Sequence, residues 1–264
     1  MGIRLDMNYN VEILAVDIGN SRIKLSFGLE TETKDIEVIE INTKWKANII
    51  KYIEYVKTLS NKEIELAYCS SNPVVENEVM EIASSLGLKI INTKELLLEK
   101  SSIRFEHVKG IGTDRVLGLD YLARIFKPPF ITIDCGTALT INVLDGVYNC
   151  LGGAILPGVY TQFKSLNRNT NSLPEIMIRE KEKRLFIGKN TEDAIKVGVI
   201  NGISGGVINI IEGIEENELM KKVNHIFITG GYAQELSISL KKWNNYLSLQ
   251  DNLILKAIKR LFQE

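Results

Sequence analysis

The sequence predicts an α/β protein built from two similar domains. Apolar segments of strand character alternate with segments whose apolar residues recur at helical spacing. An apolar strand ending in Asp-x-Gly, followed by a second strand, occurs twice, at Asp17 and at Asp134. The repeat could be a coincidence, because Asp and Gly are common turn residues. A carboxylate at the end of a strongly apolar strand is costly to bury, however, which favours a functional role. We expect domains at residues 12–115 and 116–264 that face each other across a cleft.

Periodicity and turn residues predict the elements of the first half. Residues 12–16 and 23–27 flank a polar glycine turn, as in a hairpin. Trp45–Leu59 carries apolar residues at helical spacing. The remaining segments predict a strand at 64–69, a helix at 75–86 and a strand at 88–92.

The second half repeats this alternation. Thr113 is the expected N-cap of a helix that ends before Pro128-Pro129, and strands follow at 130–133, 139–144 and 226–228. The glycine-rich residues 152–158 predict a tight turn. A helix opening at Thr191 carries Gly198, Gly202 and Gly206 at every fourth position, which predicts a close helix contact in the core or at a subunit interface.

Composition narrows the class of protein. The chain has 264 residues, 45% of them hydrophobic and 25% charged, with a net charge of −1, which argues against a broad surface for nucleic acid or anionic membrane. Cys69, Cys135 and Cys150 lack metal-ligand spacing and are expected in the core of a protein from a reducing cytoplasm. The most apolar stretch, residues 197–214, is interrupted by polar side chains, so we expect no membrane span.

Three loops at strand ends combine an acidic or hydroxyl side chain with glycine: residues 17–21, 134–140 and 229–231. Glycine lets backbone N–H groups approach a phosphate, a neighbouring Asp can hold a cation, and Lys24 can add a point charge. Neither the P-loop nor the dinucleotide fingerprint is present. The loops alone leave nucleotide binding and simple turns as alternatives.

Asp114 and the two histidines allow more than one interpretation. Asp114 falls in the first turn of a predicted helix, where it either stabilises the helix or accepts a proton from a substrate hydroxyl beside Arg115 as anion ligand. His107 and His225 have no partners at metal-ligand spacing, so we expect ordinary surface or packing roles.

In order along the chain, these segments resemble the type III pantothenate kinase family. The resemblance runs from about Ile13 to Leu261 and rests on the following segments: Asp17-Ile18-Gly19-Asn20-Ser21, Gly112-Thr113-Asp114-Arg115, Asp134-Cys135-Gly136-Thr137-Ala138-Leu139-Thr140, residues 152–158, Leu173-Pro174, Gly188-Lys189-Asn190-Thr191 and Thr229-Gly230-Gly231. The resemblance implies duplicated actin-like ATPase (ribonuclease H-like) domains. It also implies a homodimer with pantothenate at or near the interface, and transfer of the ATP γ-phosphate to the primary hydroxyl of pantothenate.

The resemblance also implies roles for individual residues, which are carried over position by position. Those implied to contact ATP and its Mg²⁺ are Asp17, Gly19, Asn20, Ser21, Lys24, Thr137, Gly230 and Gly231, with Mg²⁺ at Asp17. Those implied to hold pantothenate are Phe105, Gly112, Thr113, Asp114, Arg115 and Thr191. Asp114 would take the hydroxyl proton, and Asp134 would bind a monovalent cation, K⁺ or ammonium.

The chain departs from the family in one motif. Where the family has Tyr-x-Asn-Pro ahead of Gly-x-Asp-Arg, this sequence has Phe105, His107 and Val108. The loss of the phenol leaves room for another small hydroxyl substrate. A further alternative is an inactive binding or regulatory protein with the same fold, but the polar residues of all the loops are present, which favours the enzyme.

Overall fold

The computed structural model describes residues 11–30, 36–106, 108–177, 184–216 and 223–263. The chain divides into two compact units. The first comprises residues up to Ser102, Gly110–Leu122 and residues from Asn252 onward; the second comprises Ile103–Lys109 and Ala123–Asp251. The division differs from the predicted boundary between residues 115 and 116, because the C-terminal helix and most of the helix that follows Gly112 pack with the first unit.

The first unit contains a five-stranded mixed sheet in the order β3-β2-β1-β4-β5. β1 pairs antiparallel with β2 and β2 with β3, whereas β1–β4 and β4–β5 are parallel. The strands are β1 (Val11–Ile18), β2 (Arg22–Phe27), β3 (Ile36–Glu40), β4 (Glu63–Ser70) and β5 (Lys89–Asn92). The predicted hairpin is confirmed, but Asp17 lies within β1 rather than in the turn.

The second unit contains a five-stranded sheet in the order β10-β9-β6-β7-β8. β6–β7 and β7–β8 are antiparallel, and β6–β9 and β9–β10 are parallel. The strands are β6 (Phe130–Cys135), β7 (Ala138–Leu144), β8 (Cys150–Pro157), β9 (His225–Thr229) and β10 (Leu247–Leu249). Read from β8, the order and directions repeat those of the first sheet read from β3, so the predicted internal repeat is confirmed as a duplicated sheet.

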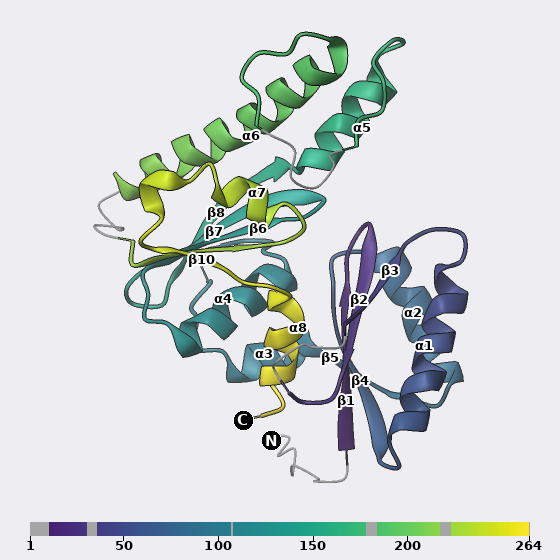
Figure 1. Ribbon diagram of the computed structural model, residues 1–264. Coiled ribbons are helices and arrows are strands. Elements are labelled where there is room, and N and C mark those ends of the chain that lie inside the picture. Colours follow the sequence, from purple (N-terminus) through teal and green to yellow (C-terminus); the bar gives the residue numbers. More distant parts are fainter. Residues whose placement is uncertain (1–10, 31–35, 107, 178–183, 217–222, 264) are drawn as a thin grey trace. The chain divides into compact units, whose positions relative to one another are not determined.

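Helices cover both faces of the first sheet, as expected for central strands that are buried on both sides. In Figure 1, α1 and α2 lie on one face and α3 and α8 on the other. The helices are α1 (Trp45–Leu59), α2 (Pro73–Ser85), α3 (Thr93–Lys100), α4 (Thr113–Ile125) and α8 (Leu253–Arg260). α8 contacts β1, β2 and β4, and it places the buried Lys259 ammonium 2.8 Å from Ser26 Oγ.

The helices of the second unit pack around one apolar cluster. They are α5 (Val159–Asn169), α6 (Thr191–Glu215), the short α7 (Ala233–Ser237) and the 3₁₀ helix η2 (Lys241–Trp243). α6 buries Ile195, Val199, Ile203, Val207 and Ile211, one residue per turn, in this cluster. By length and composition alone, α6 is also the helix among the described residues that is long and apolar enough to cross a membrane, with 33% of its apolar window buried.

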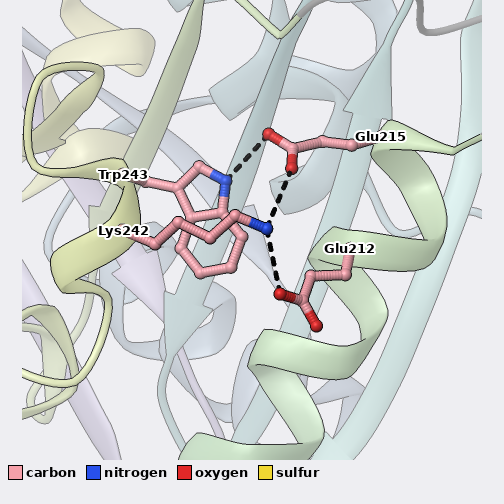
Figure 2. Close-up of polar contacts among 4 residues, drawn as sticks. All are labelled: Glu212, Glu215, Lys242 and Trp243. Atoms are coloured by element: carbon pink, nitrogen blue, oxygen red, sulfur yellow. Dashed lines mark hydrogen bonds and ion pairs between the residues drawn. The ribbon is translucent and has the colours of Figure 1, made fainter.

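Polar contacts join the C-terminal end of α6 to η2 (Figure 2). The Trp243 indole N–H donates to Glu215 Oε1 at 2.8 Å, and Lys242 Nζ lies 2.9 Å from Glu212 Oε1 and 3.9 Å from Glu215 Oε2. The Lys242 ammonium also lies 4.9 Å from the centre of the Trp243 ring. The tryptophan side chain is buried, so its N–H needs this carboxylate as acceptor.

The tight turn predicted at residues 152–158 is wrong, because most of this segment is the edge strand β8. The glycines of this strand are required for reasons other than a turn. Gly152 has φ +97° next to the register shift at Val143 and Leu144, and a side chain at Gly153 would strike the backbone of Ile141. The strand therefore needs glycine for an irregular, close pairing with β7.

Candidate active site

Asp17 lies in a row of side chains that crosses the first sheet. It stands opposite Lys24 of β2 and, on its other side, opposite Cys69 of β4. Residues directly opposite each other on paired strands share one face of a sheet, so these three side chains are neighbours. The turn at residues 19–21 follows β1, with the Gly19 N–H donating to Arg22 O at 2.9 Å and with Asn20 exposed.

The Asp114 carboxylate folds back over the start of α4. Its Oδ1 accepts from the Arg115 N–H at 2.9 Å and lies so close to Gly112 that a Cβ there would come within 3.0 Å of it. The predicted N-cap at Thr113 is wrong by one residue, because Gly112 O accepts the first helical hydrogen bonds from Arg115 N at 3.1 Å and Val116 N at 3.3 Å. Glycine at position 112 leaves the space that the carboxylate occupies.

The electrostatics place Asp17, Asp114 and Cys69 in one environment within the first unit. Burial raises the pKa of the Cys69 thiol well above its usual value, and the negative charges of Asp17 and Asp114 raise it further. Burial also raises the pKa of the Asp114 carboxyl, against the lowering effect of the Arg115 N–H and the Arg115 charge. A carboxylate with a raised pKa is a stronger base, which suits proton transfer near neutral pH.

Cys69 was predicted as a core residue, and it is buried, as are Cys135 and Cys150. Its place beside Asp17 was not predicted. In the duplicated register, Cys69 is the counterpart of Thr229, since each lies opposite the repeated Asp on the neighbouring parallel strand. Aligning the strand that precedes Ser70-Ser71 with the one that precedes Gly230-Gly231 would have revealed this position from the sequence.

Asp134 lies in the corresponding row of the second sheet. It stands opposite Thr140 of β7 and Thr229 of β9, and Thr140 stands opposite Ile155 of β8. Gly230 follows with φ +95°, and a Cβ there would lie 2.7 Å from Asp134 Oδ1 and 2.6 Å from the carbonyl carbon of Cys135. This loop therefore requires glycine beside the carboxylate. Gly231 follows and is exposed.

The turn between β6 and β7 consists of Gly136 and Thr137, both exposed. The Thr137 carbonyl accepts from Gly158 N at 2.9 Å and from Thr161 Oγ1 at 2.6 Å. The turn is thus fixed to the beginning of α5, while both of its residues remain exposed.

The remaining predicted residues are spread over both units. Phe105 is half-buried in the second unit, where Arg104 N donates to Tyr148 O at 2.9 Å and Cys150 N donates to Arg104 O at 2.7 Å. Thr191 is the exposed first residue of α6, after Asn190, whose side chain caps the helix. His107 lies outside the described residues, and His225 packs on Phe126 and Phe227 with ring centroids 5.4 Å and 5.5 Å apart.

The carboxylates of the site do not form a metal cluster of their own in the described part of the chain. Among the described residues, no three His, Cys, Asp or Glu side chains lie close enough together to hold a metal ion by themselves. This donor set still fits Mg²⁺, which usually binds through one or two carboxylates together with the phosphates of its substrate. Asp17 is such a carboxylate, near the end of β1 and just before the glycine turn of the first unit.

Comparisons with known proteins agree on one family. The model of the type III pantothenate kinase family matches residues 13–213. The type III pantothenate kinase of Sulfurihydrogenibium sp. is 32% identical over 241 residues, covering 86% of this chain and 91% of the relative. That of Flavobacterium psychrophilum is 29% identical over 262 residues, covering 95% of this chain and 98% of the relative.

Solved structures share the fold. A putative Baf family transcriptional activator from Campylobacter jejuni superposes with a TM-score of 0.59 at 17% identity, covering 95% of this chain and 97% of that one. An activator of a dehydratase from Clostridium difficile, solved with bound ADPNP, gives a TM-score of 0.53 at 11% identity, covering 96% and 94%. These likenesses and the two mixed sheets show the actin-like ATPase fold. The chain belongs to the type III pantothenate kinase family, as its ordered motifs predict.

Proposed function

We propose that this protein transfers the γ-phosphate of ATP to the primary hydroxyl of pantothenate, giving 4′-phosphopantothenate in the first step of coenzyme A biosynthesis. Family membership supports this reaction. The observation that carries the proposal is that Asp17 stands opposite Cys69 in the first sheet, while the charges of both Asp17 and Asp114 raise the pKa of the Cys69 thiol. A phosphoryl transfer needs a charged group to hold Mg²⁺ and a carboxylate to accept the proton of the attacking hydroxyl.

In this proposal the residues of the first unit divide these tasks. The Asp114 carboxylate accepts the hydroxyl proton, held in place by the Arg115 N–H. Gly112, Thr113 and Arg115 hold the pantothenate, whose carboxylate Arg115 can pair. Asp17 holds Mg²⁺ together with the ATP phosphates, and the ion supplies charge neutralisation when bound. The contributors of backbone and side-chain donors to the phosphates are Gly19, Asn20, Ser21 and Lys24.

In the second unit, the proposal gives Asp134 a monovalent cation, K⁺ or ammonium. Thr140 and Thr229 stand directly opposite Asp134, whereas Lys24 stands opposite Asp17 in the other sheet. A cation beside Asp134 could therefore be coordinated by the Thr140 and Thr229 hydroxyl oxygens, and no lysine stands opposite Asp134 on the neighbouring strands to repel it. Thr137, Gly230 and Gly231 contact ATP, and Phe105 and Thr191 contact pantothenate.

A homodimer is also part of the proposal. Four glycines of α6 are exposed: Gly198, Gly202, Gly205 and Gly213. A Cβ at any of these would meet nothing within 4 Å in this chain. Of the three glycines in the sequence prediction, Gly198 and Gly202 thus fit the subunit-interface alternative, whereas a Cβ at Gly206 would lie 3.6 Å from Leu156 Cδ2 of the same chain. Gly202→Leu should shift the mass measured by light scattering from dimer to monomer; a wild-type monomer would contradict this part. We further propose a cytoplasmic protein that binds neither nucleic acid nor membrane, consistent with its net charge of −1.

The test is ADP release by purified protein with Mg²⁺ and ATP, with and without pantothenate, in K⁺, ammonium or Na⁺. Pantothenate should stimulate ADP release, and K⁺ or ammonium should support a higher rate than Na⁺. Asp114→Asn should lose about 10²–10⁴-fold in turnover, whereas Asp251→Asn, at an exposed turn, should match wild type. No stimulation by pantothenate would refute the reaction, and equal rates in Na⁺ would refute the cation at Asp134.

Phe105 favours one alternative, a related kinase for another small hydroxyl substrate. Its ring lacks the phenol hydroxyl that the family places there. Phe105→Tyr should lower the KM for pantothenate if the pocket is a pantothenate site that has lost one hydrogen bond. ATP turnover with other small alcohols, but not with pantothenate, would favour the alternative. No turnover with any of them would favour an inactive binding or regulatory protein.

A further inference from the structure

We infer that Thr161 is a positioning residue that holds the turn of Gly136 and Thr137 in the shape in which its backbone N–H groups meet a nucleotide phosphate. This inference rests on the proposed function, because it assumes that the turn binds ATP. Thr161 lies outside the loops with which the sequence predicted ATP contact. It is the third residue of α5, and its side chain is only partly buried.

The Thr137 carbonyl is held by two donors from α5. The Thr161 hydroxyl donates to Thr137 O at 2.6 Å, and the Gly158 N–H donates to the same oxygen at 2.9 Å. One of these bonds comes from the backbone of the helix cap and one from a side chain. The side-chain bond is thus the part of this anchor that a substitution can remove without altering the backbone.

The neighbouring carbonyl also faces α5. A Cβ at Gly158 would come within 3.0 Å of Gly136 O and to 2.7 Å from Thr137 O, so both carbonyls press against the start of the helix. In a planar trans peptide the N–H points opposite to the C=O. The N–H groups of Thr137 and Ala138 are therefore directed away from α5. Successive N–H groups on one side of a turn form a concavity that favours anions.

The equivalent turn of the first unit is braced differently. There the Gly19 N–H donates to Arg22 O at 2.9 Å, so that turn closes on itself. It has three residues between β1 and β2, whereas two residues separate β6 from β7. The turn of the first unit is therefore restrained by a hydrogen bond within its own backbone, whereas the turn of the second unit is restrained by the Thr161 hydroxyl of α5.

The experiment compares Thr161→Val with Thr161→Ser and wild type. Valine keeps the shape of threonine and removes the hydroxyl, and serine restores the hydroxyl. The control is Thr170→Val, which removes a hydroxyl that also donates to a carbonyl from α5, Leu166 O at 2.7 Å, away from the turn. Binding of a fluorescent ATP analogue and the KM values for ATP and pantothenate are measured for each protein.

Thr161→Val should weaken analogue binding and raise the KM for ATP by about 2- to 10-fold, the range for loss of one hydrogen bond. The KM for pantothenate should stay unchanged, Thr161→Ser should restore ATP binding, and Thr170→Val should match wild type. Wild-type affinity in Thr161→Val, no rescue by serine, or an equal loss for both substrates would overturn the inference and leave the proposed reaction standing. Failure of wild type to bind the analogue would overturn both.

Discussion

Replacing Gly112 with alanine should misplace the proposed base while leaving the fold intact. The added Cβ would come within 3.0 Å of Asp114 Oδ1, whereas ordinary contacts begin at 3.4 Å. The carboxylate must therefore move by about half an ångström or more. It is the end of a flexible side chain, so it can move without displacing the backbone of α4. Misplacement of a reacting group by about 1 Å can cost roughly 10²-fold in rate.

We expect the kcat of Gly112→Ala to fall by about 10- to 10²-fold in the ADP-release assay. The thermal midpoint should change little, because the displaced atom belongs to a side chain and φ at Gly112 is not in the left-handed region. Gly146→Ala is the matched control. Its Cβ would meet Pro129 Cδ at an ordinary 3.7 Å, so its turnover should match wild type.

Two results would contradict this reasoning. Wild-type turnover in Gly112→Ala would show that the position of the Asp114 carboxylate seen here does not govern the reaction. A large drop in thermal midpoint, in parallel with the loss of activity, would show that Gly112 serves the fold rather than the carboxylate. A normal kcat with a raised KM for pantothenate would instead assign Gly112 to substrate binding alone.

Three further predictions concern single residues. Because burial raises the pKa of Asp114, the acidic limb of the kcat/KM–pH profile should lie above the usual range for an aspartate. Above that raised pKa, the ionised carboxylate lowers the free energy of unfolding, so Asp114→Asn should melt no lower than wild type at neutral pH. Gly230→Ala should lower both thermal midpoint and ATP binding, since it combines φ +95° with a clash against Asp134; stability equal to wild type would contradict this. Lys259→Met removes the donor to Ser26 Oγ, Phe27 O and Glu30 O, and urea unfolding should show a loss of about 1–3 kcal/mol; no loss would show that the buried ammonium contributes nothing net.

Local signals in the sequence predicted the regular elements well. Trp45–Leu59 was predicted as a helix and has those bounds, because its apolar residues recur on one face and polar segments flank it. The edge strands β3 and β10 and the helices α3, α5, α7 and α8 were not predicted. Edge strands are short and partly exposed, so they lack a strong alternating pattern. Residues 152–158 were wrongly predicted as a turn because glycines at a β-bulge resemble turn glycines in the sequence.

The candidate site was predicted in part. The loops at Asp17 and Asp134 and the pair Asp114-Arg115 stood out because acidic residues next to glycine at strand and helix ends are informative in the sequence alone. The positions of Cys69 beside Asp17 and of Thr161 beside Thr137 were not predicted, although an alignment of the two repeats would have revealed the first. Their relevance comes from contacts with residues 52 and 24 positions away in sequence, which no local pattern encodes.

The sequence by itself determined the family, the repeated Asp-x-Gly strand ends, most strands and the helices α1, α2, α4 and α6, because these depend on residue type and short-range spacing. The tertiary structure decided which residues are neighbours: that Asp114 lies over Gly112 and shares an environment with Asp17, and that the C-terminal α8 completes the first unit. The physical reason is that strand register and helix packing bring distant segments together through burial of apolar surface, and burial in turn sets the pKa of the groups enclosed.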